Sequence, residues 1–226
     1  MSSYRYIVVE GVIGVGKTTL AELLSKDFDA RLYLEIVEEN PFLVKGFYDD
    51  MDAHAFNVEI FFLLSRFRQQ QELTRNLLHT SRFLISDYLF AKNRIFAGQN
   101  LEGGELELFD SVYRPLNKKA AIPDLIIYLK ADVANLMRRI QLRDRSFERS
   151  MGADYIEAMV ERYDAFFNAY DETEVLTIDA ATMDFAFNFK TYSKIKQLIS
   201  EKIRKKTKPG SPAMTLIQKE RRERSL

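Results

Sequence analysis

A glycine-rich segment near the amino terminus constrains the fold more than any other feature of the sequence. It reads GVIGVGKT from Gly11 to Thr18, a complete G-x-x-x-x-G-K-[ST] motif between the apolar run YIVV and the helical pattern LAELLSKDF. Glycines in such a strand–loop–helix unit let backbone N–H groups meet phosphate oxygens, while the lysine reaches the β- and γ-phosphates and the threonine binds Mg²⁺. The segment predicts a bound nucleoside triphosphate, with contacts from Gly11, Gly14, Gly16, Lys17, Thr18 and Thr19.

Short β-rich runs alternate with longer helical patterns along the chain, which specifies parallel strands joined by crossover helices. With 226 residues, the chain is long enough for one such α/β domain and too short for two with a linker. The predicted five-stranded parallel sheet has strands at Tyr6–Glu10, Leu32–Val37, Phe83–Asp87, Leu125–Lys130 and Val175–Asp179. The predicted helices span Lys17–Asp27, Asp52–Leu78, Tyr88–Ala97, Glu105–Leu116, Asp132–Leu142, Ala153–Tyr170 and Phe187–Lys205.

Composition excludes several kinds of site. The chain has no cysteine and only two histidines, so disulfides, thiolate metal sites, a cysteine nucleophile and a histidine-built zinc site are not expected. No stretch approaches the roughly 18 apolar residues of a membrane span, and the start MSSYRYIVVEG lacks the pattern of a signal peptide. We expect a cytoplasmic protein that binds neither a membrane nor nucleic acid.

Charge is unevenly distributed although the formal net charge is zero. Residues 202–226 hold nine Lys or Arg against two Glu, a local charge of +7, which leaves −7 on residues 1–201. Basic termini interrupted by Pro and Gly are mostly solvated, so we expect one domain at 1–205 and a flexible basic tail at 206–226. Contact of the tail with an anionic surface is the alternative.

The phosphate loop alone does not identify what receives the phosphoryl group. A GTPase would carry an N-K-x-D motif, and a larger ATPase would need a longer chain with sensor elements; the sequence has neither. These absences favour a small kinase. Because doubly wound sheets bind ligands at the carboxyl ends of their strands, the acceptor site is expected there.

Glu59 lies in a segment that is apolar on nearly every side. The helix FNVEIFFLLSRF, residues 56–67, is predicted to be buried from several directions. Burying a carboxylate without partners costs on the order of several kcal/mol, so such a residue needs a donor or a ligand. Two interpretations remain open from the residues alone: contact with a bound ligand, or a buried ion pair with Arg66, two turns further along the same face.

Several motifs follow the phosphate loop in a characteristic order. They are EIVEENPF from Glu35, GFYDDM around Tyr48, the Glu59 helix ending in SRF, and DYLFAKNRIFA from Asp87. Over roughly residues 6–170 this order resembles the deoxynucleoside kinase family, and within it most closely the bacterial deoxyguanosine kinases. The resemblance implies an α/β P-loop kinase with a mobile, arginine-rich lid, with ATP and Mg²⁺ as cofactors and a deoxynucleoside as substrate.

The resemblance assigns two carboxylates to the transfer step. Glu35 matches the general base that takes the proton from the nucleoside 5′-hydroxyl, with a helix-capping acid as the alternative. Asp87 matches the acid beside the substrate that binds Mg²⁺ together with Thr18. Family members commonly carry Arg after this acid, whereas this chain has Tyr88. Which cation steadies the base is left open, with Arg66 or a lid arginine as candidates.

The segment RIQLRDRSFE resembles the family's lid, which closes over the triphosphate. Its cations are expected to stabilise the charge on the transferring phosphoryl group. The alternative interpretation is that these arginines form a solvated basic face of a helix. Gly usually stands where this chain has Asp144, so the backbone of the lid is expected to differ there. The catalytic cations implied by the resemblance are Lys17, Arg139, Arg143 and Arg145.

Further residues match the family's nucleoside site. Tyr48 and Glu148 correspond to the residues that bind the sugar 3′-hydroxyl, and Glu148 arrives with the lid. Arg66 and Asn93 correspond to a polar pair near the base edge. Phe96 is a stacking face if one residue is deleted relative to other members, and a core aromatic otherwise.

Glu59 falls where many family members have a glutamine that contacts the base. Gln offers one donor and one acceptor, which matches adenine or cytosine, whereas an ionised Glu offers only acceptors. Guanine presents N1–H and N2–H₂ side by side, but adenine N1 or cytosine N3 would face the carboxylate with a lone pair, at a cost of roughly 1–3 kcal/mol per unmade bond. We predict deoxyguanosine first, giving dGMP in nucleotide salvage, and deoxyinosine next.

Two other functions are compatible with the phosphate loop. A thymidylate-type nucleoside monophosphate kinase would need an arginine near the second strand to hold the acceptor phosphate, but the segment from Glu35 to Pro41 offers three carboxylates. A non-enzymatic P-loop switch module would release phosphate without any nucleoside. The family resemblance instead implies a homodimeric deoxynucleoside kinase whose domain spans 1–205.

Overall fold

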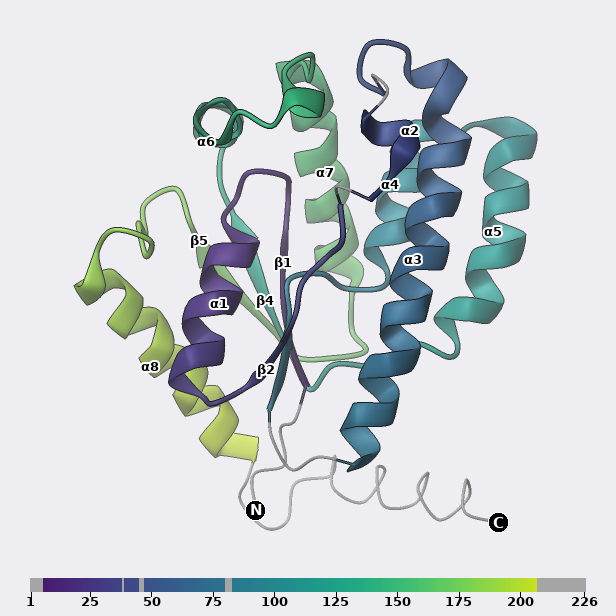
Figure 1. Ribbon diagram of the computed structural model, residues 1–226. Coiled ribbons are helices and arrows are strands. Elements are labelled where there is room, and N and C mark those ends of the chain that lie inside the picture. Colours follow the sequence, from purple (N-terminus) through teal and green to yellow (C-terminus); the bar gives the residue numbers. More distant parts are fainter. Residues whose placement is uncertain (1–5, 38, 45–46, 80–82, 207–226) are drawn as a thin grey trace, which may run out of the picture.

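The chain forms a parallel sheet between two layers of helices, as the computed structural model describes for residues 6–37, 39–44, 47–79 and 83–206. The five strands run in the same direction in the order β2-β3-β1-β4-β5 (Figure 1). The predicted five-stranded parallel α/β architecture is therefore confirmed. The strands are β1 (Tyr6–Gly11), β2 (Arg31–Tyr33), β3 (Leu84–Ser86), β4 (Leu125–Lys130) and β5 (Val175–Asp179).

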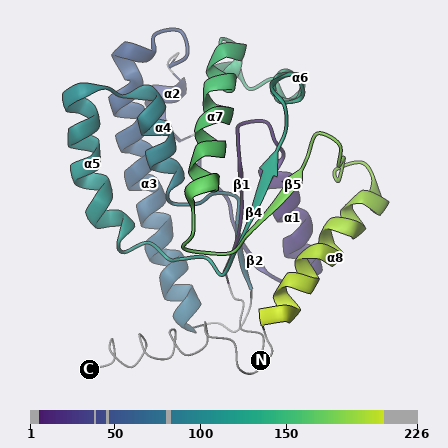
Figure 2. The same cartoon turned by 180° about the vertical axis from the view of Figure 1, so that it is seen from behind.

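Long helices cover both faces of the sheet, as Figures 1 and 2 show from opposite sides. One face carries α1 (Lys17–Asp27) and α8 (Phe189–Lys206). The other carries α3 (Met51–His79), α4 (Lys92–Asn100) and α7 (Ala153–Ala169), with α5 (Gly103–Asn117) outside them.

Three further helical elements lie at the carboxyl end of the sheet (Figure 1). They are α2 (Pro41–Val44), α6 (Val133–Arg143) and the 3₁₀ turn η1 (Ser146–Glu148). Asp132 caps α6 by accepting a hydrogen bond from the backbone N–H of Asn135 at 2.8 Å. This end of the sheet is consequently walled by segments that are far apart in the sequence.

The centre of the core is formed by β1 and β4, which are buried on both faces. Every residue of β1 is buried, and so is β4 up to Leu129. The sequence of a strand that is covered on both faces is continuously apolar, which is why YIVV and LIIYL were recognisable as strands. The buried centre holds the loops at the strand ends in fixed positions.

Element ends differ from the prediction where the chain leaves the sheet toward its carboxyl end. β2 ends at Tyr33 instead of Val37, because its pairing with β3 covers only Arg31 to Tyr33. α4 begins at Lys92 instead of Tyr88 and continues to Asn100. The short helical elements α2 and η1 were not predicted, since three or four residues are too few to show a helical periodicity.

Gly11 is required where β1 turns into the phosphate loop. Its φ is +152°, and an added Cβ would lie 2.4 Å from the carbonyl oxygen of Leu129 on the neighbouring strand. No side chain fits there without moving the backbone of β4.

We expect Gly11→Ala to lower the free energy of unfolding by about 2–4 kcal/mol, through backbone strain and overpacking together. Gly104→Ala is the matched control, because nothing lies within 4 Å of its Cβ position, and it should be neutral or slightly stabilising in α5. Urea unfolding of both variants measures the difference. Equal stabilities would contradict the close approach.

Two sequence predictions concern the chain as a whole. Among the described residues no helix is long and apolar enough to cross a membrane. The predicted tail at 206–226 lies outside the described residues apart from Lys206, the last residue of α8. The division into a domain at 1–205 and a basic tail stays a prediction.

Candidate functional site

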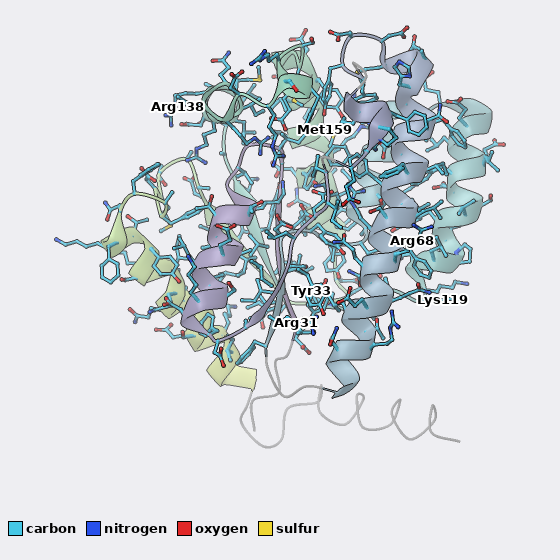
Figure 3. All side chains as sticks on the ribbon, viewed as in Figure 1. Arg31, Tyr33, Arg68, Lys119, Arg138 and Met159 are labelled. Atoms are coloured by element: carbon cyan, nitrogen blue, oxygen red, sulfur yellow. The ribbon has the colours of Figure 1, made fainter. Side chains whose placement is uncertain are left out.

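A cavity of about 1090 Å³ opens at the carboxyl end of the sheet. Arg138 of α6 lies at this end in Figure 3, whereas Arg31, at the start of β2, lies toward the opposite end. The volume is slightly above the ~300–1,000 Å³ typical of small-molecule sites, so the cavity is large for a chain of this size. The predicted site residues that line it are Gly14, Gly16, Lys17, Thr18, Thr19, Glu35, Tyr48, Glu59, Arg66, Asp87, Phe96, Arg139, Arg143, Arg145 and Glu148.

The phosphate loop forms one wall of this cavity. Gly16 has a left-handed conformation, with φ 104°, and α1 begins at the next residue. The Lys17 ammonium group donates to the carbonyl oxygens of Gly11 at 2.8 Å and Val12 at 3.2 Å. Burial and the neighbouring Lys92 lower the pKa of Lys17 to about 8. The first turn of α1 and this ammonium group together offer donors to an anion.

Thr18 and Asp87 form a set of oxygen atoms beside the loop. The Thr18 hydroxyl donates to Asp87 Oδ2 at 2.5 Å, and Asp87 Oδ1 accepts from the backbone N–H of Glu35 at 2.7 Å. Mg²⁺ is usually held by one or two protein oxygen groups together with substrate phosphates and water. Within the described parts of the chain no three His, Cys, Asp or Glu residues form a metal cluster. A hydroxyl and a carboxylate next to a phosphate loop fit Mg²⁺.

Glu35 lies just beyond the end of β2, with its carboxylate between two buried cations. Arg66 from α3 donates to Oε1 through both Nε and Nη2, and Lys92 from α4 donates to Oε2 at 2.7 Å. Burial alone would raise the pKa of the Glu35 carboxyl, but Lys92 and Arg66 outweigh burial and hold the pKa well below its usual range. Glu35 is therefore a fixed, ionised carboxylate that lines the cavity.

Glu59 lines the same cavity from α3 and is 1% exposed, which confirms the predicted burial of this segment. Asn100 donates to its Oε1 at 2.7 Å, and the Tyr155 hydroxyl bonds Asn100 Oδ1 at 3.1 Å. Oε2 is buried with no hydrogen-bond partner among the described residues. The alternative of an ion pair between Glu59 and Arg66 is wrong, because Arg66 bonds Glu35 instead.

The Glu59 carboxyl has an unusual protonation equilibrium. Burial raises its pKa to about 7, although Asn100 and the more distant Arg66 oppose the shift. Unlike Glu35, it has no cation bound to it among the described residues. An orphaned buried oxygen on such a group indicates a place where a ligand's donors would be received.

The lid segment contributes arginines with different partners. Arg139 donates to the carbonyl oxygens of Val15 at 3.1 Å and Ala180 at 2.7 Å, which ties α6 to the phosphate loop and to the segment after β5. Arg143 forms a bidentate ion pair with Glu148, whose carboxylate is also 4.0 Å from Arg145. All three guanidinium groups line the cavity, and their role in phosphate binding stays a prediction.

Asp144 adopts the backbone conformation that glycine favours. Its φ is 49° at the carboxyl end of α6, and its carboxylate bonds the Arg149 guanidinium at 2.7 and 2.9 Å. Asp is one of the few non-glycine residues that tolerate this conformation. Whether the backbone of this lid differs from that of a lid with glycine stays a prediction.

Two predicted residues are not among those that line the cavity. Gly11 is the last residue of β1 and is buried. Its carbonyl oxygen accepts a hydrogen bond from the Lys17 ammonium group. Asn93 is fully buried; it accepts from Arg66 Nη1 and donates to the carbonyl oxygen of Phe90. Asn93 thus orients Arg66 instead of facing the cavity.

Two residues of the site, Lys92 and Asn100, were not predicted from the sequence. Lys92 is inside the motif DYLFAKNRIFA, where a lysine directly after the apolar run YLFA was a usable signal. Asn100 gave no signal, because its contact with Glu59 depends on how α3 and α4 pack. Both line the cavity.

Comparisons with known proteins agree with this geometry. A family model for deoxynucleoside kinases matches residues 7–204. Deoxyguanosine kinase of Bacillus subtilis (strain 168) is 36% identical over 207 residues, which cover 90% of this chain and 100% of the relative. Deoxyadenosine/deoxycytidine kinase of the same organism is 31% identical over 179 residues, 76% of this chain and 81% of the relative.

A solved structure of deoxyadenosine kinase from M. mycoides with bound dATP has a TM-score of 0.75 to this chain. The match is 24% identical in sequence and covers 87% of this chain and 100% of that one. At this level of identity the likeness concerns the fold alone.

Proposed function

Because the chain belongs to the deoxynucleoside kinase family, we propose that it transfers the γ-phosphoryl group of ATP to the 5′-hydroxyl of a purine deoxynucleoside, with deoxyguanosine as the preferred acceptor. Deoxynucleoside kinase activity follows from the family assignment. One observation carries the residue-level proposal: Glu35 lines the same cavity as the phosphate loop, and its backbone bonds Asp87, which bonds Thr18. A carboxylate is thereby held next to the predicted triphosphate.

The phosphate loop would bind the triphosphate of the donor. Lys17 exchanges its bonds to two loop carbonyl groups for phosphate oxygens, and the N–H groups at the start of α1 face the same anion. Thr18 and Asp87 would hold Mg²⁺, which neutralises phosphate charge when it is bound. Phosphoryl transfer needs little more from a protein than positioning and stabilisation of this charge.

Glu35 would act on the acceptor. The 5′-oxygen attacks the γ-phosphorus, the bond from that phosphorus to the β–γ bridging oxygen breaks, ADP leaves, and the hydroxyl proton goes to the Glu35 carboxylate. The low pKa of Glu35 makes it a weak base, which suits a loose transition state where the hydroxyl loses its proton late. The carboxylate's main contribution is then to orient the hydroxyl and accept its proton.

The base preference is proposed from Glu59. Its Oε2 is buried and unpartnered, while Asn100 Nδ2 occupies one side of Oε1. Guanine N1–H and N2–H₂ supply two donors to such a carboxylate, and deoxyinosine supplies only the first. The curated relatives include both a deoxyguanosine kinase and a deoxyadenosine/deoxycytidine kinase, so the base is argued from this side chain.

The sugar would be held between α7 and the lid. Tyr48 packs edge-on against Tyr155 of α7, with ring centroids 5.5 Å apart, and lines the cavity together with Glu148. Arg143 holds Glu148 in the lid. We propose that Tyr48 and Glu148 bind the sugar 3′-hydroxyl. Nucleoside binding and lid closure then favour each other.

The alternative functions lack supporting features. An acceptor with its own phosphate would need a cation near β2, but Arg66 and Lys92 are both bound to Glu35. A switch module has no acceptor, so it would not require a cavity that extends beyond the predicted triphosphate site. The homodimer remains a proposal from the family resemblance, and the cytoplasmic location remains an expectation from the sequence.

A phosphate-transfer assay with γ-labelled Mg-ATP tests the function. Deoxyguanosine, deoxyinosine, deoxyadenosine, deoxycytidine and thymidine are compared with their monophosphates and with no acceptor. We expect label in dGMP above all other products. Transfer to monophosphates would support the thymidylate-type alternative, and phosphate release without acceptor would support the switch module.

A further inference from the structure

The cation missing after Asp87 has a replacement from the next helix. Tyr88, at the position where an arginine was expected, is fully buried and is not among the residues that line the cavity. It therefore cannot contact an acceptor there. Lys92, the first residue of α4, lines the cavity and bonds Glu35 Oε2 at 2.7 Å.

Lys92 occupies an energetically unfavourable position. Its side chain is 5% exposed, and a buried ammonium group costs several kcal/mol, by order of magnitude, unless it is paired. It also stands at the amino end of a helix, where the helix dipole disfavours a cation. The carboxylates of Glu35, in contact, and Glu10, an electrostatic neighbour on β1, offset both costs. A buried lysine at such a position indicates a role beyond packing.

The two cations on Glu35 are not equivalent. Arg66 is committed to protein groups, since it bonds Glu35 Oε1 and Asn93 Oδ1. Lys92 has three N–H donors, and in the described parts of the chain its hydrogen-bond acceptor is Glu35 Oε2. Lys92 lines the cavity, and its ammonium nitrogen also lies 5.3 Å from the centre of the Phe96 ring.

We propose that Lys92 is the positioning residue of Glu35, in place of the arginine that is absent at position 88. This inference rests on the proposed function, because it assigns Glu35 the role of base. Lys92 fixes Oε2 and keeps the carboxylate from rotating fully onto Arg66. It also keeps a positive charge beside the reacting oxygen after Glu35 has been neutralised by the transferred proton.

A double-mutant cycle tests whether Lys92 acts through Glu35. Lys92→Met, Glu35→Gln and the double variant are compared in kcat and in KM for deoxyguanosine. We expect Lys92→Met to lower kcat about 100-fold with KM changed less than about threefold, because a mispositioned base affects turnover more than binding. The double variant should be no slower than Glu35→Gln alone, since residues that act as a unit are not additive.

Two controls complete the design. Lys92→Arg retains the charge and should keep about a tenth or more of the wild-type kcat, which a role in packing alone would not predict. Lys26→Met removes an exposed lysine of α1 and should leave kcat unchanged. If Lys92→Met fails to fold, as judged by thermal melting, Lys92→Gln takes its place in the cycle.

The outcomes separate this inference from the proposed function. A wild-type protein that does not phosphorylate deoxyguanosine removes the proposed function itself. If the wild type is active, either of two results overturns the inference alone. One is a kcat of Lys92→Met within about threefold of the wild-type value. The other is a double variant in which the losses of the two single variants multiply.

Discussion

Replacing Glu35 by Gln is expected to lower kcat for deoxyguanosine phosphorylation by about 10²–10⁴-fold, the range that general-base groups contribute. The amide keeps the size of the side chain but cannot accept the 5′-hydroxyl proton. It also leaves Arg66 and Lys92 buried beside a neutral group, where both now bond the carboxylate. Steady-state kinetics give kcat, and isothermal titration calorimetry gives the affinity for deoxyguanosine, which should change far less.

The control for this substitution is the same change at an exposed carboxylate. Glu22 lies on the surface of α1, outside the cavity, so Glu22→Gln should behave as wild type. A Glu35→Gln enzyme with near-normal kcat would remove Glu35 from the base role. Thermal melting of both variants reports whether a loss of activity arises from unfolding.

Replacing Glu59 by Gln is expected to change which base the enzyme selects. Asn100 donates to Oε1, so the Gln oxygen should remain there and its NH₂ group should take the place of Oε2. That orientation presents a donor to adenine N1 or cytosine N3 and opposes guanine N1–H with another donor. At roughly 1–3 kcal/mol per mismatched bond, the ratio of kcat/KM for deoxyguanosine over deoxyadenosine should fall by about 10²–10⁴-fold.

The same carboxyl predicts that base preference depends on pH. Burial raises the pKa of Glu59 to about 7, so lowering the pH from roughly 8 to 6 protonates it in the free enzyme. Protonated Glu offers one donor and one acceptor, as Gln does. The deoxyguanosine-to-deoxyadenosine ratio of kcat/KM should therefore fall at the lower pH in the wild type and stay constant in Glu59→Gln. A wild-type ratio that is independent of pH, or a wild type that prefers deoxyadenosine, would contradict the role of Glu59.

The central architecture was predictable because its signals are local. The phosphate loop, the apolar runs of β1 and β4, and the α1 pattern from Lys17 to Asp27 are each determined by short stretches whose periodicity or glycine spacing is readable. Glu35 and Asp87 were assigned through the family resemblance; in the structure Asp87 directly follows β3, and Glu35 lies just beyond the end of β2.

Pairings between distant elements were not predictable from the residues. One of two interpretations paired Arg66 with Glu59 because the two share a helical face, but Arg66 reaches across to the segment after β2 and bonds Glu35. Arg66 had been named as a candidate for that contact only through the family resemblance. The contact between Asn100 and Glu59 likewise depends on how α3 and α4 pack, which no local pattern encodes. Helical spacing identifies residues on the same face and does not determine which partner a long side chain reaches.

The most direct test of the central claim is a crystal structure of the protein with deoxyguanosine, ADP and Mg²⁺. We predict the nucleoside 5′-oxygen within about 2.6–3.2 Å of a Glu35 carboxylate oxygen, with the guanine N1–H and N2–H₂ edge against Glu59. A complex in which the 5′-oxygen faces away from Glu35, or in which the base lies out of reach of Glu59, would contradict it.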